Sequence, residues 1–383
     1  MIPLSVPNIK GEEWEYVKEC LDTEWVSSAG SFVERFEDDI SNFTGAKYVI
    51  ACSSGTSALH ISLKLSGVQP GDEVIIPSLT FIAPVNAIKY NGANPIFMDA
   101  DNYFNLDVEK TIEFLKNETF QKNGYSYNKK TKNKITAIVP VHMWGNAVDL
   151  APLINICFDM GIKIVEDSSE SLGTFYNKNE LKGKHTGTLG TLGCLSFNGN
   201  KIITTGGGGA ILTNDKRLAT KARYLTTQAK DDPIRYIHND IGFNYRLTNV
   251  QAAIGVGQFE MLGSFLDRKK EIYQFYLSNI NDTNGYSISQ VPEYSINNHW
   301  LNILKINKNK SKMDREGLMK YLHKNKIQTR PPWYLNHLQK PYKKYQKYKI
   351  EKSFDLVDYS LCIPSSSNLS KTELLQIIKY INE

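Results

Sequence analysis

The sequence predicts an α/β protein in which helices cover a mostly parallel sheet, with a smaller α+β region at the C-terminal end. Three observations lead to this prediction. Short apolar segments alternate with amphipathic ones through the first part of the chain, several apolar segments end in polar residues, and the alternation stops beyond Thr248. Strands that alternate with helices of this length need crossover connections, which make neighbouring strands parallel.

In chain order, the first part is expected to contain helices at 12–23, 31–44, 57–66, 83–91 and 150–160, and strands at 48–51, 74–76, 94–98, 135–141 and 163–165. The polar stretch 117–134 is expected to be an inserted loop. A long helix should begin at Thr248 and run towards Leu277, followed by a strand near 300–306 and helices at 312–324 and 371–382. We place a domain boundary within the long helix, between a large domain of residues 1–254 and a small domain of residues 255–383.

The composition is that of an ordinary globular protein, with 41% apolar residues, 22% charged residues and a formal charge of +5. The lysines are dispersed, so we expect no nucleic-acid surface. No apolar stretch approaches the ~20 residues of a membrane span and no leader pattern precedes the first helix, which predicts a cytoplasmic protein without a membrane segment. The five cysteines are far apart and lack metal-ligand spacing, so we expect buried thiols and no metal site.

The segment Cys52–Leu59 follows a predicted strand and opens a helix. Gly55 permits a tight turn, after which the N–H groups of Gly55, Thr56 and Ser57 are free at the helix start. Such amides, together with the helix dipole, bind phosphate groups. An ordinary helix cap has the same residue types, and this segment alone leaves both interpretations open.

The segment Val165–Glu170 places Asp167 at the end of an apolar strand, the edge where ligands of parallel sheets bind. A carboxylate there can serve as a metal ligand, a base or the partner of a cation, or it can cap the next turn.

Lys201 differs from the other lysines because small hydroxyl residues and four glycines, Gly206 to Gly209, surround it in the sequence. A lysine between a strand and a glycine-rich turn lies where the backbone can approach a ligand closely. A Walker-type phosphate loop does not fit, because its glycines precede the lysine.

The segment Gly242–Leu247 precedes the long helix and by itself would be a capped helix start. Taken in order, these segments and Pro77–Phe81 resemble the DegT/DnrJ/EryC1/StrS family of sugar-nucleotide aminotransferases. The resemblance runs from Pro3 to about Gln258, and its motifs are Ser-Gly-Thr-Ser-Ala-Leu, Pro-Ser-Leu-Thr-Phe, Glu-Asp, Ser-Phe-x-x-x-Lys and Gly-x-Asn-x-Arg. It implies the aspartate aminotransferase type of fold, which is fold type I of the transferases that depend on pyridoxal 5′-phosphate (PLP).

The resemblance implies PLP as the cofactor and a role for each matched residue. Lys201 would hold the cofactor as a Schiff base and move a proton between substrate and cofactor, and Asp167 would pair with the ring nitrogen. Phe81 would stack on the ring and Glu170 would lie near its 3′-oxygen. Asn244 would reach the phosphate from a neighbouring subunit, which implies a homodimer with the active site at the subunit interface. Within one chain, the phosphate would be held by Ser54, Gly55, Thr56 and Ser196.

Two departures from the common family pattern point to one branch. Gly207 stands where a glutamate is usual, and Glu-Asp-Ser-Ser-Glu at 166–170 replaces Glu-Asp-Ala-Ala-Gln. With the Asn-Gly-Asn-Lys stretch and the Tyr-Asn-Lys-Lys loop at 127–130, they resemble enzymes that aminate C4 of UDP-linked 4-keto-6-deoxy-N-acetylglucosamine for bacillosamine or legionaminic acid. GDP- and dTDP-linked 4-keto-6-deoxyhexoses, used by perosamine synthase-like enzymes, are the alternative substrates.

The implied reaction is a ping-pong transfer in which L-glutamate leaves as 2-oxoglutarate and the amino group is carried as pyridoxamine 5′-phosphate. Lys201 must be neutral to act as a base, and burial and a nearby pyridinium both favour the neutral amine. The candidate contacts to the nucleotide-linked keto sugar, each with a packing or surface role as its alternative, are His185, Arg330, Trp333 and His337.

Three other functions fit the sequence less well. A sugar 3-dehydrase of the same fold has a histidine in place of the lysine. A dinucleotide oxidoreductase would show Gly-x-Gly-x-x-Gly after an early strand, and no such motif is present. A non-catalytic sugar-nucleotide-binding protein would not need Lys201 and Asp167 together.

Overall fold

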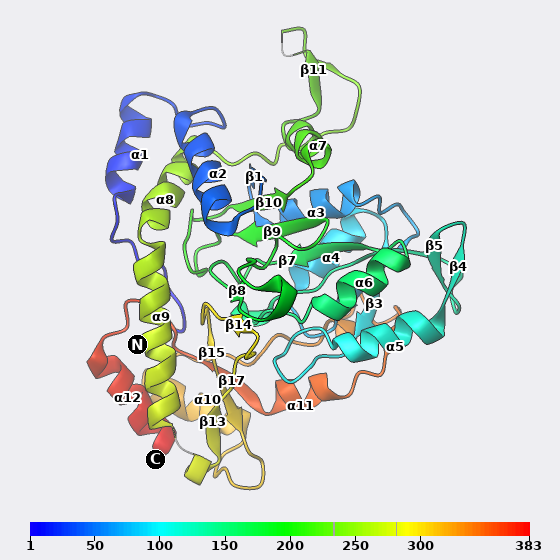
Figure 1. The fold of residues 1–383 in the computed structure, drawn as a ribbon. Helices are drawn as coiled ribbons and strands as arrows, with labels where there is room; N and C mark the ends of the chain where they lie inside the picture. Colours follow the sequence, from blue (N-terminus) through cyan, green and yellow to red (C-terminus); the bar gives the residue numbers. More distant parts are fainter. Residues whose placement is uncertain (233, 281) are drawn as a thin grey trace.

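The computed structural model describes residues 1–232, 234–280 and 282–383, and its centre is a sheet covered by helices (Figure 1). The strand order is β1-β10-β9-β7-β6-β2-β3-β16. The strands from β9 to β16 in this order run parallel, and β10 is antiparallel to both of its neighbours. Their bounds are β1 Tyr48–Cys52, β2 Glu73–Pro77, β3 Asn94–Met98, β6 Lys134–Ile138, β7 Lys163–Asp167, β9 Leu192–Ser196, β10 Gly209–Thr213 and β16 Lys347–Tyr348.

The predicted α/β class with a mostly parallel sheet is confirmed, and the predicted helices of the first part are present within a few residues of their expected ends. The strand expected at 163–165 continues to Asp167, so that this carboxylate belongs to the last residue of β7. The helices are α1 Glu13–Asp22, α2 Ser31–Thr44, α3 Gly55–Leu65, α4 Ile82–Tyr90, α5 Val108–Glu118, α6 Ala151–Asp159 and α7 Lys216–Thr226.

The inserted loop predicted at 117–134 is wrong in one respect, because it contains a β-hairpin of β4 (Thr119–Lys122) and β5 (Tyr125–Asn128). Asn123 and Gly124 join the two strands, with φ values of 51° and 76°. An Asn-Gly pair with both residues in the left-handed region makes a two-residue turn whose twist suits a hairpin. β5 also pairs with β6, which attaches the hairpin to the central sheet.

The long helix predicted from Thr248 is two helices, α8 (Asn249–Glu260) and α9 (Leu262–Asn279), separated at Met261. Thr248 begins α8 through a capping box with Gln251. Gly263 and Ser264 follow the break, and residues of these types commonly accompany kinks.

The C-terminal part is built on an antiparallel sheet of β13 (Tyr286–Ile288), β15 (Asn302–Ile306) and β17 (Ser360–Ile363), with α10 (Arg315–Lys324), α11 (Lys352–Asp358) and α12 (Lys371–Asn382). A hydrophobic cluster of its own contains Ile272, Leu318 and Ile377, and Ile2 joins it from the start of the chain. Leu262 and Phe265 of α9 instead belong to the large cluster of the first part. The boundary between residues 254 and 255 stays a prediction.

Two short strand pairs complete the fold. β8 (Phe175–Tyr176) pairs with β14 (Ser295–Ile296) and so joins the first part of the chain to the C-terminal part. β11 (Lys230–Asp232) and β12 (Ile237–His238) form an arm that projects from the top of the molecule in Figure 1. Among the helices of the described ranges, none combines the length and the hydrophobicity needed to cross a bilayer.

Candidate active site

A cavity lies at the sheet edge where β7 and β9 end, and the segment around Arg330 closes its other side. Its volume is about 430 Å³, within the range of about 300–1,000 Å³ found for small-molecule sites. It brings together most of the site residues predicted from the sequence, namely Ser54, Gly55, Thr56, Phe81, Asp167, Glu170, Ser196, Lys201, Arg330 and Trp333.

Lys201 follows β9 at the end of a tight turn, in which its N–H donates to the carbonyl of Asn198 at 2.9 Å. Its side chain is 14% exposed, and Nζ lies 3.8 Å from Oε1 of Glu170. Burial lowers the pKa of Lys201, and the carboxylates of Glu170 and Asp167 oppose that shift without cancelling it. The result is an amine that loses its proton more readily than a surface lysine.

Asp167, the last residue of β7, is almost fully buried. Its Oδ1 accepts a hydrogen bond from the N–H of Ser169 at 3.0 Å. Its backbone is held as well, because its N–H donates to Pro140 and its carbonyl accepts from His142. Burial raises the pKa of Asp167, against the hydrogen bonds of Ser169 and the charge of Lys201. A positively charged partner in the cavity would therefore stabilise the ionised carboxylate.

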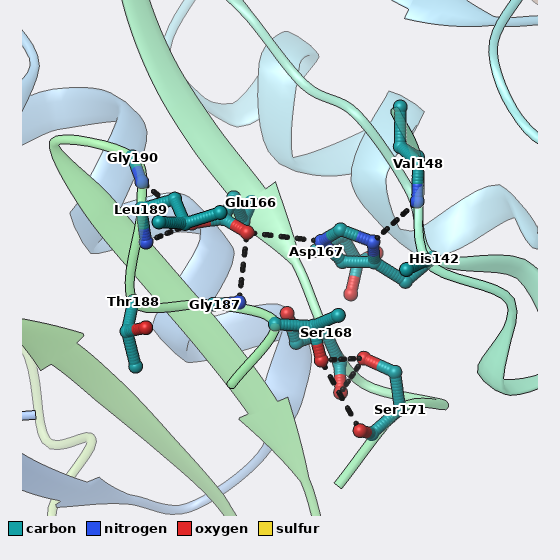
Figure 2. A network of polar contacts seen from close by, with 12 residues as sticks. His142, Val148, Glu166, Asp167, Ser168, Ser171, Gly187, Thr188, Leu189 and Gly190 are labelled. Atoms are coloured by element: carbon teal, nitrogen blue, oxygen red, sulfur yellow. Dashed lines mark hydrogen bonds and ion pairs between the residues drawn. The ribbon is translucent and has the colours of Figure 1, made fainter. Parts of the chain in front are cut away.

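Glu166 lies behind Asp167, on the opposite face of the strand, in the network of Figure 2. Its carboxylate accepts from His142 Nε2 at 3.0 Å and from the backbone N–H groups of Gly187, Leu189 and Gly190 at 2.8, 2.7 and 2.5 Å. Burial alone would raise the pKa of Glu166, but these hydrogen bonds outweigh it and the pKa lies below its ordinary value.

His142 completes the network, because its Nδ1 accepts the N–H of Val148 at 3.0 Å (Figure 2). Both ring nitrogens are satisfied when the proton is on Nε2, facing the ionised carboxylate of Glu166. This buried group ties the end of β7 to the loop after β6 and to the turn before β9, so that the segments carrying Asp167 and Ser196 are fixed relative to each other.

Glu170 is the second carboxylate of the cavity. Its Oε2 accepts the N–H of Trp144 at 2.8 Å, and its backbone carbonyl accepts Asn298 Nδ2 at 2.9 Å. Burial raises the pKa of Glu170, and the neighbouring charge of Lys201 lowers it in part.

The start of α3 forms one end of the cavity. Ser54 is its N-cap, since the Ser54 hydroxyl accepts the N–H of Ser57 at 3.0 Å. The cap and the phosphate site predicted as alternatives are therefore compatible, because Gly55 and Thr56 stand in the first turn, where a helix offers their N–H groups no partner. A Cβ at Gly55 would lie 2.8 Å from Cβ of Ser196, so only glycine allows β9 to come this close.

The glycine-rich stretch after Lys201 serves two purposes. A Cβ at Gly209 would lie 2.5 Å or less from the backbone of Ser54 and Gly55, so this glycine permits β10 to pack against the start of α3. Gly207 lines the cavity, and a Cβ there would find no atom closer than 3.9 Å. The structure thus has room for a side chain at the position where the family commonly has glutamate.

Aromatic and basic side chains form the open end of the cavity. The Phe81 ring is half exposed and lies 5.1 Å from the Trp333 ring, and the guanidinium of Arg330 stacks on Trp333 at 4.1 Å. Among the described residues, three buried atoms here have no hydrogen-bond partner, and they are Thr80 Oγ1, Arg330 Nε and Trp333 Nε1.

The structure places His185 and His337 outside the cavity, and their contact with the sugar stays a prediction. His185 accepts the N–H of Gly173 at 2.9 Å and packs between Phe43 and Phe175. His337 bonds the hydroxyl of Ser78 at 2.6 Å. Burial lowers the pKa of each histidine to about 4, which is typical of a neutral packing residue.

Asn244 is exposed and outside the cavity of its own chain, so its contact with a partner's cofactor stays a prediction.

Several lining residues were not predicted, and the most notable is Trp300. It was expected to begin a strand, but it precedes β15 and its ring lies 4.0 Å from Nζ of Lys201. Nothing near it in the sequence signals a cavity residue. The other unpredicted polar or glycine residues that line the cavity are Thr80, Ser169, Asn198, Asn200, Gly207 and Gly208.

The residues present fit PLP. The cavity offers a largely buried amine for an aldehyde, a buried carboxylate for a ring nitrogen and a helix start for a phosphate, in Lys201, Asp167 and Gly55–Thr56. The donor atoms of Thr80 and Arg330 that lack partners in the described residues provide further polar contacts.

Comparison with known proteins agrees with this geometry. A model of the DegT/DnrJ/EryC1/StrS aminotransferase family matches residues 7–382. The chain is 38% identical to the GDP-perosamine synthase of Escherichia coli O157:H7 over 100% of this chain and 98% of that protein. It is 37% identical to the GDP-perosamine synthase of Caulobacter vibrioides, covering 89% and 86% of the two chains. A solved DegT DnrJ EryC1 StrS aminotransferase from Brucella abortus has a TM-score of 0.87 at 26% identity, covering 97% of this chain and 94% of that one.

Proposed function

The chain belongs to the DegT/DnrJ/EryC1/StrS aminotransferase family and is a PLP-dependent sugar aminotransferase, and we propose that it transfers the amino group of L-glutamate to C4 of a nucleotide-linked 4-keto-6-deoxy sugar. The observation that carries this proposal is the buried amine of Lys201 in one cavity with the carboxylates of Asp167 and Glu170. The product would be an amino sugar for polysaccharide biosynthesis.

PLP, when bound, supplies an aldehyde that links to amines and a ring that withdraws electrons from the adjacent carbon. Lys201 Nζ would hold that aldehyde, and as a free amine it would be the base that takes the proton from the α-carbon of the bound amino donor. Asp167 would keep the ring nitrogen protonated, and the N–H groups of Gly55 and Thr56 with the Ser196 hydroxyl would hold the phosphate.

Burial supports the part of Lys201 as a base. An amine must be neutral to accept a proton, and the low exposure of Lys201 lowers its pKa in that direction. The ring of Trp300, 4.0 Å from Nζ, covers one side of the amine and limits the access of water to it.

Arg330 and Trp333 are assigned to the substrates. A guanidinium at the open end of the cavity suits an anion, either the carboxylates of glutamate or the phosphates of the sugar nucleotide. The exposed face of Phe81 offers apolar surface beside it.

The nucleotide has two candidates. The relatives from E. coli and C. vibrioides are GDP-perosamine synthases, which favours a GDP-linked 4-keto-6-deoxyhexose. The Asn198–Lys201 turn and Glu170 favour the UDP-linked 4-keto-6-deoxy-N-acetylglucosamine expected from the sequence. Purified protein incubated with glutamate and with the GDP-, UDP- or dTDP-linked keto sugar, with products identified by mass, decides between them. Turnover of the UDP sugar alone would reject the first candidate.

A homodimer is supported by the β11–β12 arm, which projects from the body (Figure 1) and exposes Ile234, Tyr236 and Ile237. Apolar side chains on a projecting arm are typical of a surface that packs against another subunit. Asn244, which follows the arm, would then approach the partner's cofactor. A protein that sediments as a monomer at micromolar concentration would contradict this.

The proposed function is tested by trapping the cofactor on its lysine. We expect borohydride to fix PLP on the wild-type protein, and digestion to place the added mass on the peptide containing Lys201. Lys201→Ala should bind no covalent cofactor and lose turnover by more than about 10⁴-fold, since both the attachment point and the base are lost. Unchanged thermal unfolding of the cofactor-free variant is the control. A labelled lysine elsewhere, or turnover by the variant, would reject the proposal.

A further inference from the structure

Lys269 is a buried lysine that the reaction above does not use. It lies on α9, is 3% exposed, and pairs with no carboxylate among the described residues. Nζ donates to two backbone carbonyls instead, those of Trp300 at 2.8 Å and Ser365 at 2.6 Å. An apolar residue would fill the same space without desolvating an amine, but it would leave both carbonyls unsatisfied. A lysine is therefore suited to this position because it bonds the backbone of two separate segments, at Trp300 and at Ser365.

Trp300, the residue held by Lys269, is fixed at two further points. Its N–H donates to Asn298 Oδ1 at 3.0 Å, and its indole Nε1 donates to the carbonyl of Asn200 at 2.7 Å. The Asn298 amide also bonds the carbonyls of Glu170 and Leu172. Hydrogen bonds on both sides of the backbone and at the ring leave the indole, which is 1% exposed, a single orientation.

That orientation places the indole against both ends of Lys201. The ring nitrogen holds the carbonyl of Asn200, the residue before Lys201, and the ring face lies 4.0 Å from Nζ. A ring at this distance confines the amine sterically and attracts its protonated form. The carboxylates of Glu170 and Asp167 attract the same amine, and Glu170 Oε1 lies 3.8 Å from Nζ.

We propose that Trp300 is a positioning residue for Lys201, and that Lys269 sets the place of Trp300 from behind. This inference rests on the proposed function of Lys201 and adds to it the reason why its amine has one defined orientation. Lys269 serves in either protonation state, because a neutral amine still has two N–H groups for the two carbonyls. Burial lowers the pKa of Lys269 to about 7, so both states occur near neutral pH.

The first test compares turnover of Trp300→Leu, Trp300→Phe and Lys269→Met. A lysine displaced by about 1 Å loses on the order of 100-fold in rate, so Trp300→Leu should lower kcat by that factor and leave the KM for glutamate within about three-fold. Trp300→Phe keeps a ring face without the N–H donor, so its kcat should lie between that of Trp300→Leu and that of the wild type. Lys269→Met should lower kcat in the same selective way. Lys305→Met, which removes a half-buried lysine of β15 whose Nζ lies over the Phe104 ring at 6.0 Å, is the matched control and should keep the wild-type kcat.

The second test uses cofactor-free protein, so that it does not depend on turnover. A charged amine 4.0 Å from an indole changes the emission of that indole, so titration of Lys201 should produce a pH-dependent component of tryptophan fluorescence. The groups that face Lys201, Glu170, Asp167 and Arg330, are present in every variant compared. The component should be absent from Trp300→Phe and from Lys201→Met and should persist in Trp333→Phe.

The outcomes separate the two proposals. If borohydride labels Lys201 but Trp300→Leu retains the wild-type kcat, or the fluorescence component persists in Trp300→Phe, the positioning role is rejected while the proposed function stands. If borohydride labels another lysine, the proposed function fails first. Lys269→Met could also lower both kcat and the free energy of unfolding while the fluorescence titration stays that of the wild type. In that case Lys269 stabilises the fold and does not position Trp300.

Discussion

The two sides of the cavity differ in how completely their polar atoms are bonded. The floor, formed by Asp167, Glu170 and Lys201 at the ends of β7 and β9, is held by hydrogen bonds from Ser169 and Trp144 and by the ion pair of Lys201 with Glu170. The mouth consists of Thr80, Phe81, Arg330 and Trp333, and in the described residues three of its buried polar atoms have no partner.

This difference separates a prearranged site from an adaptable one. A buried polar atom without a partner costs about 1–3 kcal/mol, which a fold tolerates where a ligand supplies the missing bond. The floor differs, because its two carboxylates already accept backbone N–H groups and Glu166 behind them accepts four hydrogen bonds. We infer that the floor binds the cofactor with little rearrangement, and that the mouth acquires its final bonds from the substrates.

After the removal of Lys201 itself, the largest effect is expected at the floor, from Asp167→Asn. The amide has the size of the carboxylate but cannot stabilise a protonated ring nitrogen, so kcat should fall by about 10²–10³-fold, the loss typical of removing one preorganised electrostatic group. Steady-state kinetics with glutamate measures it, and borohydride labelling of Lys201 checks that the cofactor is still attached. Full activity of Asp167→Asn would mean that the floor does not control the ring nitrogen.

The second prediction concerns the support of the floor. Glu166→Gln places an N–H group among backbone donors that need an acceptor, so the free energy of unfolding at pH 7 should fall by about 3 kcal/mol. The pKa of Glu166 is lowered in the folded protein, so its stabilising contribution is complete above the unfolded pKa of about 4.3 and disappears as the pH falls through the folded value. Urea denaturation at pH 7 and at pH 4 measures both, and the gap between variant and wild type should narrow at the lower pH. If the difference in free energy of unfolding between variant and wild type grew at pH 4, Glu166 would not be ionised in the folded protein at pH 7.

The contrast between floor and mouth also explains what the sequence could predict. Asp167 ends an apolar strand, and Lys201 follows another within a few residues, so a local pattern locates each of them at the same edge of a parallel sheet. The Asn123-Gly124 pair is an equally local signal for the β4–β5 hairpin, because these two residue types adopt the left-handed conformation that such a turn needs.

The mouth could be predicted only in part, because its members come from distant segments. Arg330 reaches the cavity through backbone pairing with Cys362. Trp300, which lies beside Lys201 of the floor, depends in the same way on a distant residue, Lys269 of α9. His337 shows the limit of residue type as a guide, since it is only four residues from Trp333 in the sequence but its ring bonds Ser78 outside the cavity. Which way such a side chain points depends on long-range packing that no local pattern records.

A smaller effect is expected at the mouth, from Arg330→Met. The loss of a guanidinium that contacts an anionic substrate should raise KM by about 10–100-fold, the range of a hydrogen bond to a charged group, and leave kcat within a few-fold. Separate saturation curves for glutamate and for the sugar nucleotide show which substrate Arg330 contacts. Arg217→Met, at a 92% exposed side chain, is the control. A loss confined to kcat would place Arg330 with the floor and remove the distinction between the two sides.

The smallest effect is expected from Glu170→Gln, which tests whether the floor is electrostatically tuned as well as rigid. The carboxylate of Glu170 attracts the proton of Lys201 and so opposes the lowering of the lysine pKa by burial. Glutamine keeps the size and removes that attraction, so at pH 7 more of Lys201 should be neutral and its acetylation by acetic anhydride should be faster by roughly five- to ten-fold. Peptide mass spectrometry of cofactor-free protein measures the rate at this one lysine.

Glu73→Gln is the matched control, because Glu73 is as buried as Glu170 but bonds Asn128 outside the cavity. An unchanged rate would mean that Glu170 is already uncharged at neutral pH, in which case the floor carries one negative charge instead of two and Asp167 alone balances Lys201.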